Sequence, residues 1–209
     1  MDDSLSIQIV ELKRDAALEG VRDRLEKKGD PIQILDECRQ GMTIVGERFQ
    51  AGDYFLAELM LSAEIFKSAA AILDPYLAGT QARENSGKVL LATPKGDIHD
   101  LGKNIVATLL KAHGFDVYDL GVDVPPEIIV AKVRETSPDF VGFSALITVA
   151  FDSMKQTVNL LEEAGLRNQL KIMVGGGVTT PEVRRYVGAD FQTVDATEGV
   201  AYCTRTAGR

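Results

Sequence analysis

The sequence predicts two units of different class, an all-α bundle followed by an α/β domain with a parallel sheet. Over residues 1–80, apolar residues recur every three or four positions, which is the helical period. After residue 87, short apolar runs alternate with helical stretches, the pattern of parallel strands joined by crossover helices. With 209 residues, 45% of them hydrophobic, the chain is long enough to bury a core in each unit.

Four helices are expected in the first unit, which we place at residues 1–80 as a helical cap domain. A short first helix covers about residues 7–12, and Asp15 is expected to cap the start of the second. The third begins at Asp30 and Pro31, an N-cap followed by proline at the first helical position, where its missing N–H costs nothing.

The third and fourth helices each carry one apolar face. In the third helix this face comprises Ile34, Leu35, Cys38, Met42, Val45 and Phe49. In the fourth, over about residues 55–77, it comprises Leu59, Ala63, Phe66 and Ala70. Because short connections make consecutive helices antiparallel neighbours, the four are expected to form a four-helix bundle.

A polar, glycine-containing linker at residues 81–87 is expected to lead into an α/β domain at residues 88–209. Strands are expected at residues 88–93, 115–120, 140–147, 171–176 and 191–195. Five such runs separated by helices predict a doubly wound, five-stranded parallel sheet of the Rossmann or flavodoxin-like type. Such sheets bind ligands beyond the carboxyl ends of their strands, so the loops after the strands should hold the functional residues.

The composition excludes several classes of function. A net charge of -8 without any basic run argues against a nucleic-acid partner, which requires a concentrated positive surface. No secretory signal begins the sequence and no apolar segment approaches the length that spans a membrane, so the cytoplasm is the expected compartment. Cys38 and Cys203 are too far apart to suggest a disulfide framework or a thiolate metal site.

Three of the loops that follow strands contain small and polar residues, at 94–102, 142–148 and 175–180. Glycine-rich loops often bind phosphate, but neither a G-x-G-x-x-G nor a Walker pattern follows the first strand. The more informative residue is His99, one of two histidines in the chain. A lone histidine is more often structural than functional, so its neighbours have to decide its role.

Asp97 lies two residues before His99, where its carboxylate can bind one ring nitrogen while the other points outward as a metal ligand. A protein zinc site needs three or four ligands, and His113, Cys38 and Cys203 form no plausible set with His99. A single protein ligand indicates a metal that arrives already held by a macrocycle.

These loops resemble the cobalamin-binding signature of methionine synthase, corrinoid-dependent methyltransferases and carbon-skeleton mutases. The residues that carry the resemblance are Asp97, His99, Gly102, Ser144, Leu146, Gly175 and Gly176. Residues 46–59, "GERFQAGDYFLAEL", are similar to the helical cap that precedes this domain in the methyltransferase branch. The resemblance therefore covers essentially the whole chain.

The resemblance implies that His99 replaces the dimethylbenzimidazole base of cobalamin as the lower axial ligand to cobalt. The loop residues around it, Gly96, Ile98 and Asp100, are then expected cofactor contacts. The displaced nucleotide tail would enter a slot whose walls are made of small residues: Gly142, Ser144, Gly175, Gly176 and Gly177.

Ser144 and Thr148 are the expected polar contacts to the tail. One position departs from the family. Methionine synthase continues its Asp–His pair to a serine two residues beyond the threonine, and this chain has Ala150 there, so the relay behind Asp97 is expected to be shorter or to use water. In the cap, Tyr54, Phe55 and Leu59 match residues that cover the upper face of the cofactor, and bundle core is their alternative role.

By this resemblance the chain is a corrinoid methyl carrier. It would take a methyl group on Co(I) from a donor held by one methyltransferase subunit and pass it from methyl-Co(III) to tetrahydrofolate or a thiol coenzyme on another. A reductive activase is a further expected partner. The sequence contains no separate catalytic set, so the chain alone is not expected to turn over.

Two alternatives belong to other classes. The cobalamin-binding small subunit of a mutase would lack the helical cap at residues 1–80, and a cobalamin-sensing regulator normally carries a further module. The methyl donor stays open among methanol, methylamines, betaines and methoxylated aromatics, because its site lies on another polypeptide.

Overall fold

A computed structural model describes residues 4–77 and 86–208 of the chain. The chain divides into two compact units, Met1–Glu84 and Asn85–Arg209. Residues 81–85 of the predicted linker lie outside the described residues.

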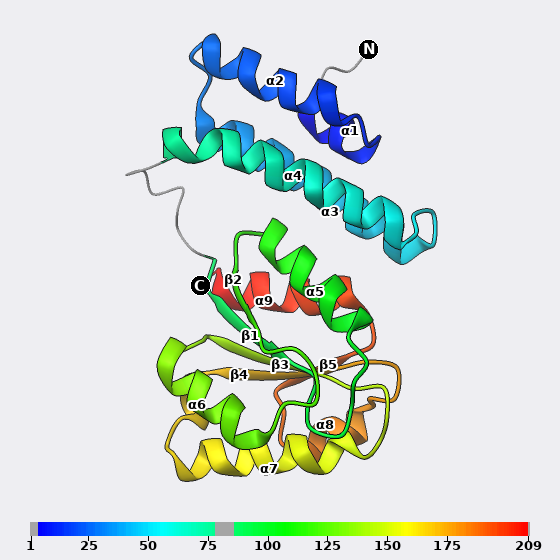
Figure 1. The fold of residues 1–209 in the computed structure, drawn as a ribbon, viewed down its shortest axis with the longest axis vertical. Helices are drawn as coiled ribbons and strands as arrows, with labels where there is room; N and C mark the ends of the chain where they lie inside the picture. Colours follow the sequence, from blue (N-terminus) through cyan, green and yellow to red (C-terminus); the bar gives the residue numbers. More distant parts are fainter. Residues whose placement is uncertain (1–3, 78–85, 209) are drawn as a thin grey trace. The chain divides into compact units, whose positions relative to one another are not determined.

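The first unit is the predicted bundle of four helices (Figure 1). They are α1 (Leu5–Val10), α2 (Arg14–Glu26), α3 (Pro31–Ala51) and α4 (Leu56–Leu77). α3 packs against both α1 and α4, and α2 packs against α4. The large side chains that are fully buried in this unit include Leu5, Ile9, Val21, Met42, Val45, Leu59, Ile65 and Leu73, and burying each contributes roughly 1.5–3 kcal/mol.

The predicted N-cap residue is correct for α3 and wrong for α2. The Asp30 carboxylate accepts a hydrogen bond from the Ile32 N–H at 2.9 Å, which confirms the predicted start of α3. The prediction that Asp15 caps α2 is wrong, because the helix begins at Arg14 and Lys13 holds the N-cap position. A tight turn after α1 starts α2 early, and Asp15 instead places a negative charge in its first turn, which the helix dipole favours.

The second unit contains the predicted parallel sheet, with strand order β2-β1-β3-β4-β5. The strands are β1 (Lys88–Ala92), β2 (Asp116–Asp119), β3 (Phe140–Ser144), β4 (Lys171–Gly175) and β5 (Phe191–Thr193). The central strands β1, β3 and β4 are almost entirely buried, as their continuous apolar runs predicted.

Helices cover both faces of the sheet (Figure 1). α5 (Leu101–Ala112) and α9 (Ala196–Ala207) pack together on one face, and the other carries α6 (Pro126–Thr136), α7 (Ala150–Glu163) and α8 (Pro181–Val187). A short 3₁₀ turn, Arg167–Gln169, precedes β4. The fully buried core under α6, α7 and α8 includes Leu90, Ile129, Val141, Met154, Leu161 and Ile172.

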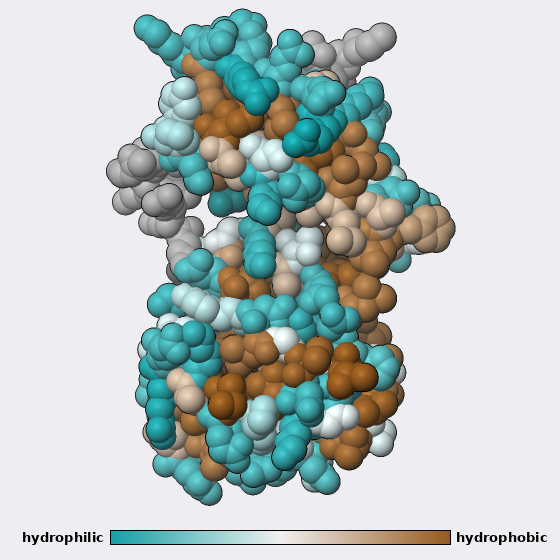
Figure 2. Space-filling model, viewed as in Figure 1, coloured by the Kyte–Doolittle hydropathy of each residue, from teal (hydrophilic) through white to brown (hydrophobic). Residues whose placement is uncertain are grey.

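Figure 2 shows apolar residues gathered in patches on the surface of both units, among hydrophilic side chains. Such patches commonly mark sites where a ligand or a partner binds. Among the described helices, none combines the length and the apolar character that crossing a lipid bilayer requires.

Candidate functional site

The loops after β1, β3 and β4 meet at the carboxyl edge of the sheet. The Ala145 N–H donates to the Gly175 carbonyl at 2.9 Å, which continues the pairing of β3 with β4 into the loops. Gly176 has a φ of +109°, and a Cβ at this position would lie 2.0 Å from the Ala145 carbonyl oxygen. Only glycine allows this approach of the two loops.

Asp97 is fully buried and its two carboxylate oxygens are used differently. Oδ1 accepts a hydrogen bond from the His99 backbone N–H at 2.9 Å and lies 2.7 Å from the Nδ1 atom of the same residue. Oδ2 accepts from the N–H groups of Leu146, at 2.7 Å, and Ile147, at 3.2 Å. Burial raises the pKa of Asp97, but these hydrogen bonds outweigh it and hold the pKa below its usual value, so the group is a carboxylate at neutral pH.

The His99 side chain is half exposed, and its ring is fixed at one nitrogen. Because a carboxylate can only accept, Nδ1 carries the proton that it shares with Asp97, and the lone pair is left on Nε2. The His99 carbonyl accepts from the hydroxyl of Thr93, which is fully buried at the end of β1. The arrangement offers one oriented imidazole nitrogen as a metal ligand.

Ala150 is fully buried in the first turn of α7 and offers no hydroxyl to Asp97. Backbone amides of the β3–α7 loop take that place, since Leu146 and Ile147 donate to Oδ2. The Oδ2 atom of Asp97 therefore has main-chain partners, at the place where the sequence predicts a shorter relay or a water molecule.

The other predicted loop residues gather around this pair. A Cβ at Gly96, whose φ is +93°, would lie 3.4 Å from Val149 Cγ1, and one at Gly102 would lie 3.9 Å from Ser144 Oγ. Asp100 occupies the N-cap position of α5. The structure thus brings to one edge of the sheet Gly96, Asp97, Ile98, His99, Asp100, Gly102, Ser144, Leu146, Thr148, Gly175 and Gly176.

Gly142 is set back from this edge. It lies in the middle of β3, where a Cβ would come within 2.6 Å of Leu91 Cδ2. Its small size makes room for the Leu91 side chain in the packing of the sheet, and its place in the wall of the slot stays a prediction.

Large apolar side chains also lie exposed at this edge, and most were missed from the sequence. Ile98 was expected there, and it is 73% exposed. Four more exposed apolar residues follow the carboxyl ends of β1, β2, β3 and β5 and were not among the predicted site residues: Leu101, Val122, Val149 and Val194. Val122 and Val149 follow predicted strands by two residues, and this position is the sequence signal that could have found them. Leu101 starts α5, and Val194 falls within the strand predicted at 191–195, so these two carry no such signal.

The three predicted cap residues differ in their surroundings. Leu59 is fully buried within the bundle, the placement that the alternative interpretation gave it. The Tyr54 hydroxyl donates to the Val10 carbonyl, and the Arg48 guanidinium lies 5.3 Å from the centroid of its ring. Phe55 is 72% exposed just before α4. Of the three, Phe55 presents the largest exposed surface.

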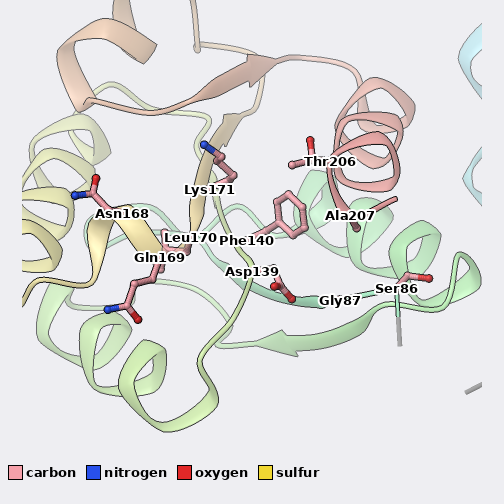
Figure 3. A pocket seen from close by; sticks show the side chains of 10 residues that line it. All are labelled: Ser86, Gly87, Asp139, Phe140, Asn168, Gln169, Leu170, Lys171, Thr206 and Ala207. Carbon is pink, nitrogen blue, oxygen red and sulfur yellow. The ribbon is translucent and has the colours of Figure 1, made fainter. Parts of the chain in front are cut away.

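A pocket of about 480 Å³ lies at the opposite edge of the sheet (Figure 3). It is lined by the beginnings of β1, β3 and β4 and by the end of α9, with Asp139, Phe140, Lys171 and Thr206 among its residues. Ligands of open α/β sheets bind at the carboxyl ends of the strands, and this pocket lies at their amino ends. It is separate from the site around His99.

Comparison with known proteins identifies the family. Residues 87–201 match the model of a B12 binding domain, and residues 1–74 match a second model with the same description. The chain belongs to the B12-binding, or corrinoid, protein family. Both units are covered, so the helical bundle is part of the family's architecture as well as the α/β domain.

Relatives of this corrinoid protein span nearly its whole length. Dimethylamine corrinoid protein 2 of Methanosarcina mazei is 35% identical over 198 residues, 94% of this chain and 92% of that protein. A cobalamin-binding protein from Desulfitobacterium hafniense has a solved structure with 41% identity and a TM-score of 0.81, covering 97% of each chain. The methanol:cobalamin methyltransferase complex MtaBC from Methanosarcina barkeri gives a TM-score of 0.85 at 28% identity, over 98% of this chain and 78% of that chain.

These matches confirm the predicted family, its two-part fold and the corrinoid as its cofactor. Among the described residues, no three His, Cys, Asp or Glu side chains come together in a way that could hold a metal ion.

Proposed function

We propose that this protein is a corrinoid methyl carrier in which His99 is the lower axial ligand to cobalt. The observation that carries the proposal is the Asp97–His99 pair, with Nδ1 bonded to a buried carboxylate and the lone pair on Nε2. The partners we propose are a donor-specific methyltransferase, a tetrahydrofolate- or thiol-dependent methyltransferase and a reductive activase. Relatives named as a dimethylamine corrinoid protein and a methanol:cobalamin methyltransferase complex support this role.

The residues at the carboxyl edge fit a corrinoid in three respects. One imidazole is the donor set expected for a metal whose equatorial positions a macrocycle fills. Exposed apolar side chains such as Ile98, Leu101 and Val149 suit the apolar face of a large flat ring. The close approach of the loops at Gly176, which a Cβ would block, leaves glycine beside Ala145 where the nucleotide tail would enter.

The protein's own residues would hold and orient the cofactor. Asp97 keeps the proton on His99 Nδ1, which fixes the tautomer and makes Nε2 a better donor. Ser144 and Thr148 would make polar contacts to the nucleotide tail. Among the proposed covering residues of the cap, Phe55 has the exposed ring, while Tyr54 and Leu59 would support it from the bundle.

When bound, the corrinoid supplies the cobalt atom that carries the methyl group between the two methyltransferases. The chain's part in that exchange is ligation, shielding from water and presentation to each partner.

The ligation test uses the protein loaded with cobalamin and reduced to the Co(II) state. Electron paramagnetic resonance should show superhyperfine coupling from one protein imidazole nitrogen, and this coupling should disappear in His99→Ala. The matched control is His113→Ala, because the Nδ1 atom of that second histidine lies 2.8 Å from the Leu109 carbonyl oxygen at the end of α5, away from the site. Coupling from dimethylbenzimidazole in the unaltered protein would refute the assignment of His99.

The carrier role is tested separately, with methylated cobalamin bound to the protein. Adding a tetrahydrofolate-dependent or a thiol-dependent methyltransferase with its acceptor should demethylate the cofactor and yield one methylated acceptor per protein. If neither class of partner demethylates it, while either one demethylates dimethylamine corrinoid protein 2 of Methanosarcina mazei in parallel, the carrier role is wrong.

A further inference from the structure

The loop between β2 and α6, residues 120–125, contains none of the motif residues that carry the family resemblance, yet backbone hydrogen bonds join it to the segment that leads into His99. The Thr93 N–H donates to the Gly121 carbonyl at 3.0 Å, and the Val124 N–H donates to the Thr93 carbonyl at 3.0 Å. The Lys95 N–H donates to the Val124 carbonyl at 2.9 Å. The pairing of β1 with β2 thus continues past both strands, up to the residue before Gly96.

Asp123 makes the last two contacts of this series, and they lie on both sides of the Asp97 α-carbon. Its Oδ1 atom accepts from the Gly96 N–H at 2.8 Å, and its own N–H donates to the Asp97 carbonyl at 2.9 Å. One residue therefore holds the main chain before and after the carboxylate that bonds to His99.

The backbone of Asp123 has a left-handed conformation, with a φ of +53°. Few residues other than glycine adopt this conformation, and aspartate and asparagine are the usual exceptions. At this place the chain has both the conformation and the carboxylate, although glycine would satisfy the conformation more easily. The aspartate side chain adds what glycine lacks, an oxygen that accepts the hydrogen bond from the Gly96 N–H.

We infer that Asp123 is a positioning residue for the axial histidine, acting through Asp97. Asp123 holds the Gly96–Asp97 backbone, the β3–α7 amides hold the Asp97 carboxylate, and Asp97 sets the direction and tautomer of the His99 ring. The inference rests on the proposed function, because only a ligand role makes the ring direction matter.

The test compares three substitutions of Asp123 that separate its two properties. Asp123→Asn keeps an oxygen acceptor and tolerates the left-handed backbone; Asp123→Gly tolerates the backbone but has no acceptor; Asp123→Ala has neither. Glu127→Gln is the matched control, since it removes an exposed carboxylate four residues further on, in the first turn of α6. Circular dichroism and thermal melting establish that each variant is folded.

The first readout needs no cofactor. Nuclear magnetic resonance of ¹⁵N-labelled histidine at about pH 8.5, above the ordinary imidazole range, reports which ring nitrogen carries the proton. His99 should be protonated at Nδ1 in the unaltered protein, Asp123→Asn and Glu127→Gln. In Asp123→Gly and Asp123→Ala part of the population should move to Nε2–H, while the signals of His113 stay unchanged as an internal reference.

The second readout is titration with aquocobalamin, followed by its visible spectrum. Loss of an outer partner of a ligand commonly costs about 10–100-fold in affinity, and because Asp123 is exposed and one residue further out we expect about 3–10-fold for the Gly and Ala variants. Asp123→Asn and Glu127→Gln should bind as the unaltered protein does.

Two results would overturn the inference: folded Gly and Ala variants with unchanged tautomer and affinity, or a change in Asp123→Ala alone, which would assign the effect to backbone strain. Failure of the proposed function is distinct, because the unaltered protein would then bind aquocobalamin without histidine ligation.

Discussion

Gly176→Ala should strongly destabilise the α/β unit, because two costs coincide at this position. A non-glycine residue at a left-handed φ costs about 1–2 kcal/mol, and here φ is +109°. The new Cβ would lie 2.0 Å from the Ala145 carbonyl oxygen, and relieving such an overlap in a packed region costs about 1–3 kcal/mol. The free energy of unfolding should therefore fall by roughly 2–5 kcal/mol.

Urea unfolding followed by thiol labelling can assign this loss to one unit. Cys203 is buried in the α/β unit and Cys38 in the bundle, so each thiol reports the opening of its own unit. The midpoint for Cys203 should fall while that for Cys38 stays unchanged. Gly177→Ala is the neighbouring control, because its Cβ would meet only the end of the Leu146 side chain at 3.3 Å. If the two variants unfold within about 1 kcal/mol of each other, the close approach at Gly176 is not required.

Two further predictions concern titratable groups. The folded-state pKa of Asp97 lies below its unfolded value, so its contribution to stability is present above about pH 4 and is lost as the pH falls through the lower, folded-state pKa. Asp97→Asn should therefore have a lower free energy of unfolding at pH 7, and that free energy should depend less on pH in the acid range. Urea unfolding at a series of pH values measures this, and the same pH dependence in both proteins would contradict the depressed pKa. Burial raises the pKa of Cys38 and Cys203 to about 12, so iodoacetamide at about pH 8 should leave both thiols unmodified in the native protein and alkylate both in urea.

Periodicity was enough to predict both units, because the apolar stripes of the helices and the continuous runs of the strands directly reflect which faces are buried. The Asp97–His99 pair was predictable because it is local in sequence. A carboxylate two residues before an imidazole can reach one of the ring nitrogens, whatever the rest of the fold does. Leu59 shows the limit of the method. An apolar residue on a helix face has the same pattern whether it packs in the bundle or faces a ligand, and here it is fully buried.

The remaining parts of the site come from loops distant in sequence. The Leu146 and Ile147 amides that hold Asp97 have no side-chain signature, because every residue except proline offers a backbone N–H. Asp123 was missed because its role depends on a backbone conformation and on a contact with Gly96, 27 residues earlier in the chain. The start of α2 was missed because the turn before it, and not the best capping side chain, sets where the helix begins.

Because backbone N–H groups hold Asp97, support of the carboxylate does not depend on which side chains the donor residues carry. A serine hydroxyl in their place would tie that support to one residue type. Leu146 and Ile147 support the carboxylate through their N–H groups, while the Leu146 side chain is 47% exposed at the carboxyl edge. A substitution at Leu146 can therefore reshape the exposed surface of this edge while its backbone N–H still holds the Asp97 carboxylate. Proline lacks the backbone N–H that donates to Asp97, so this arrangement excludes it. Side chains of any other chemistry are compatible with the hydrogen bonds at these two positions.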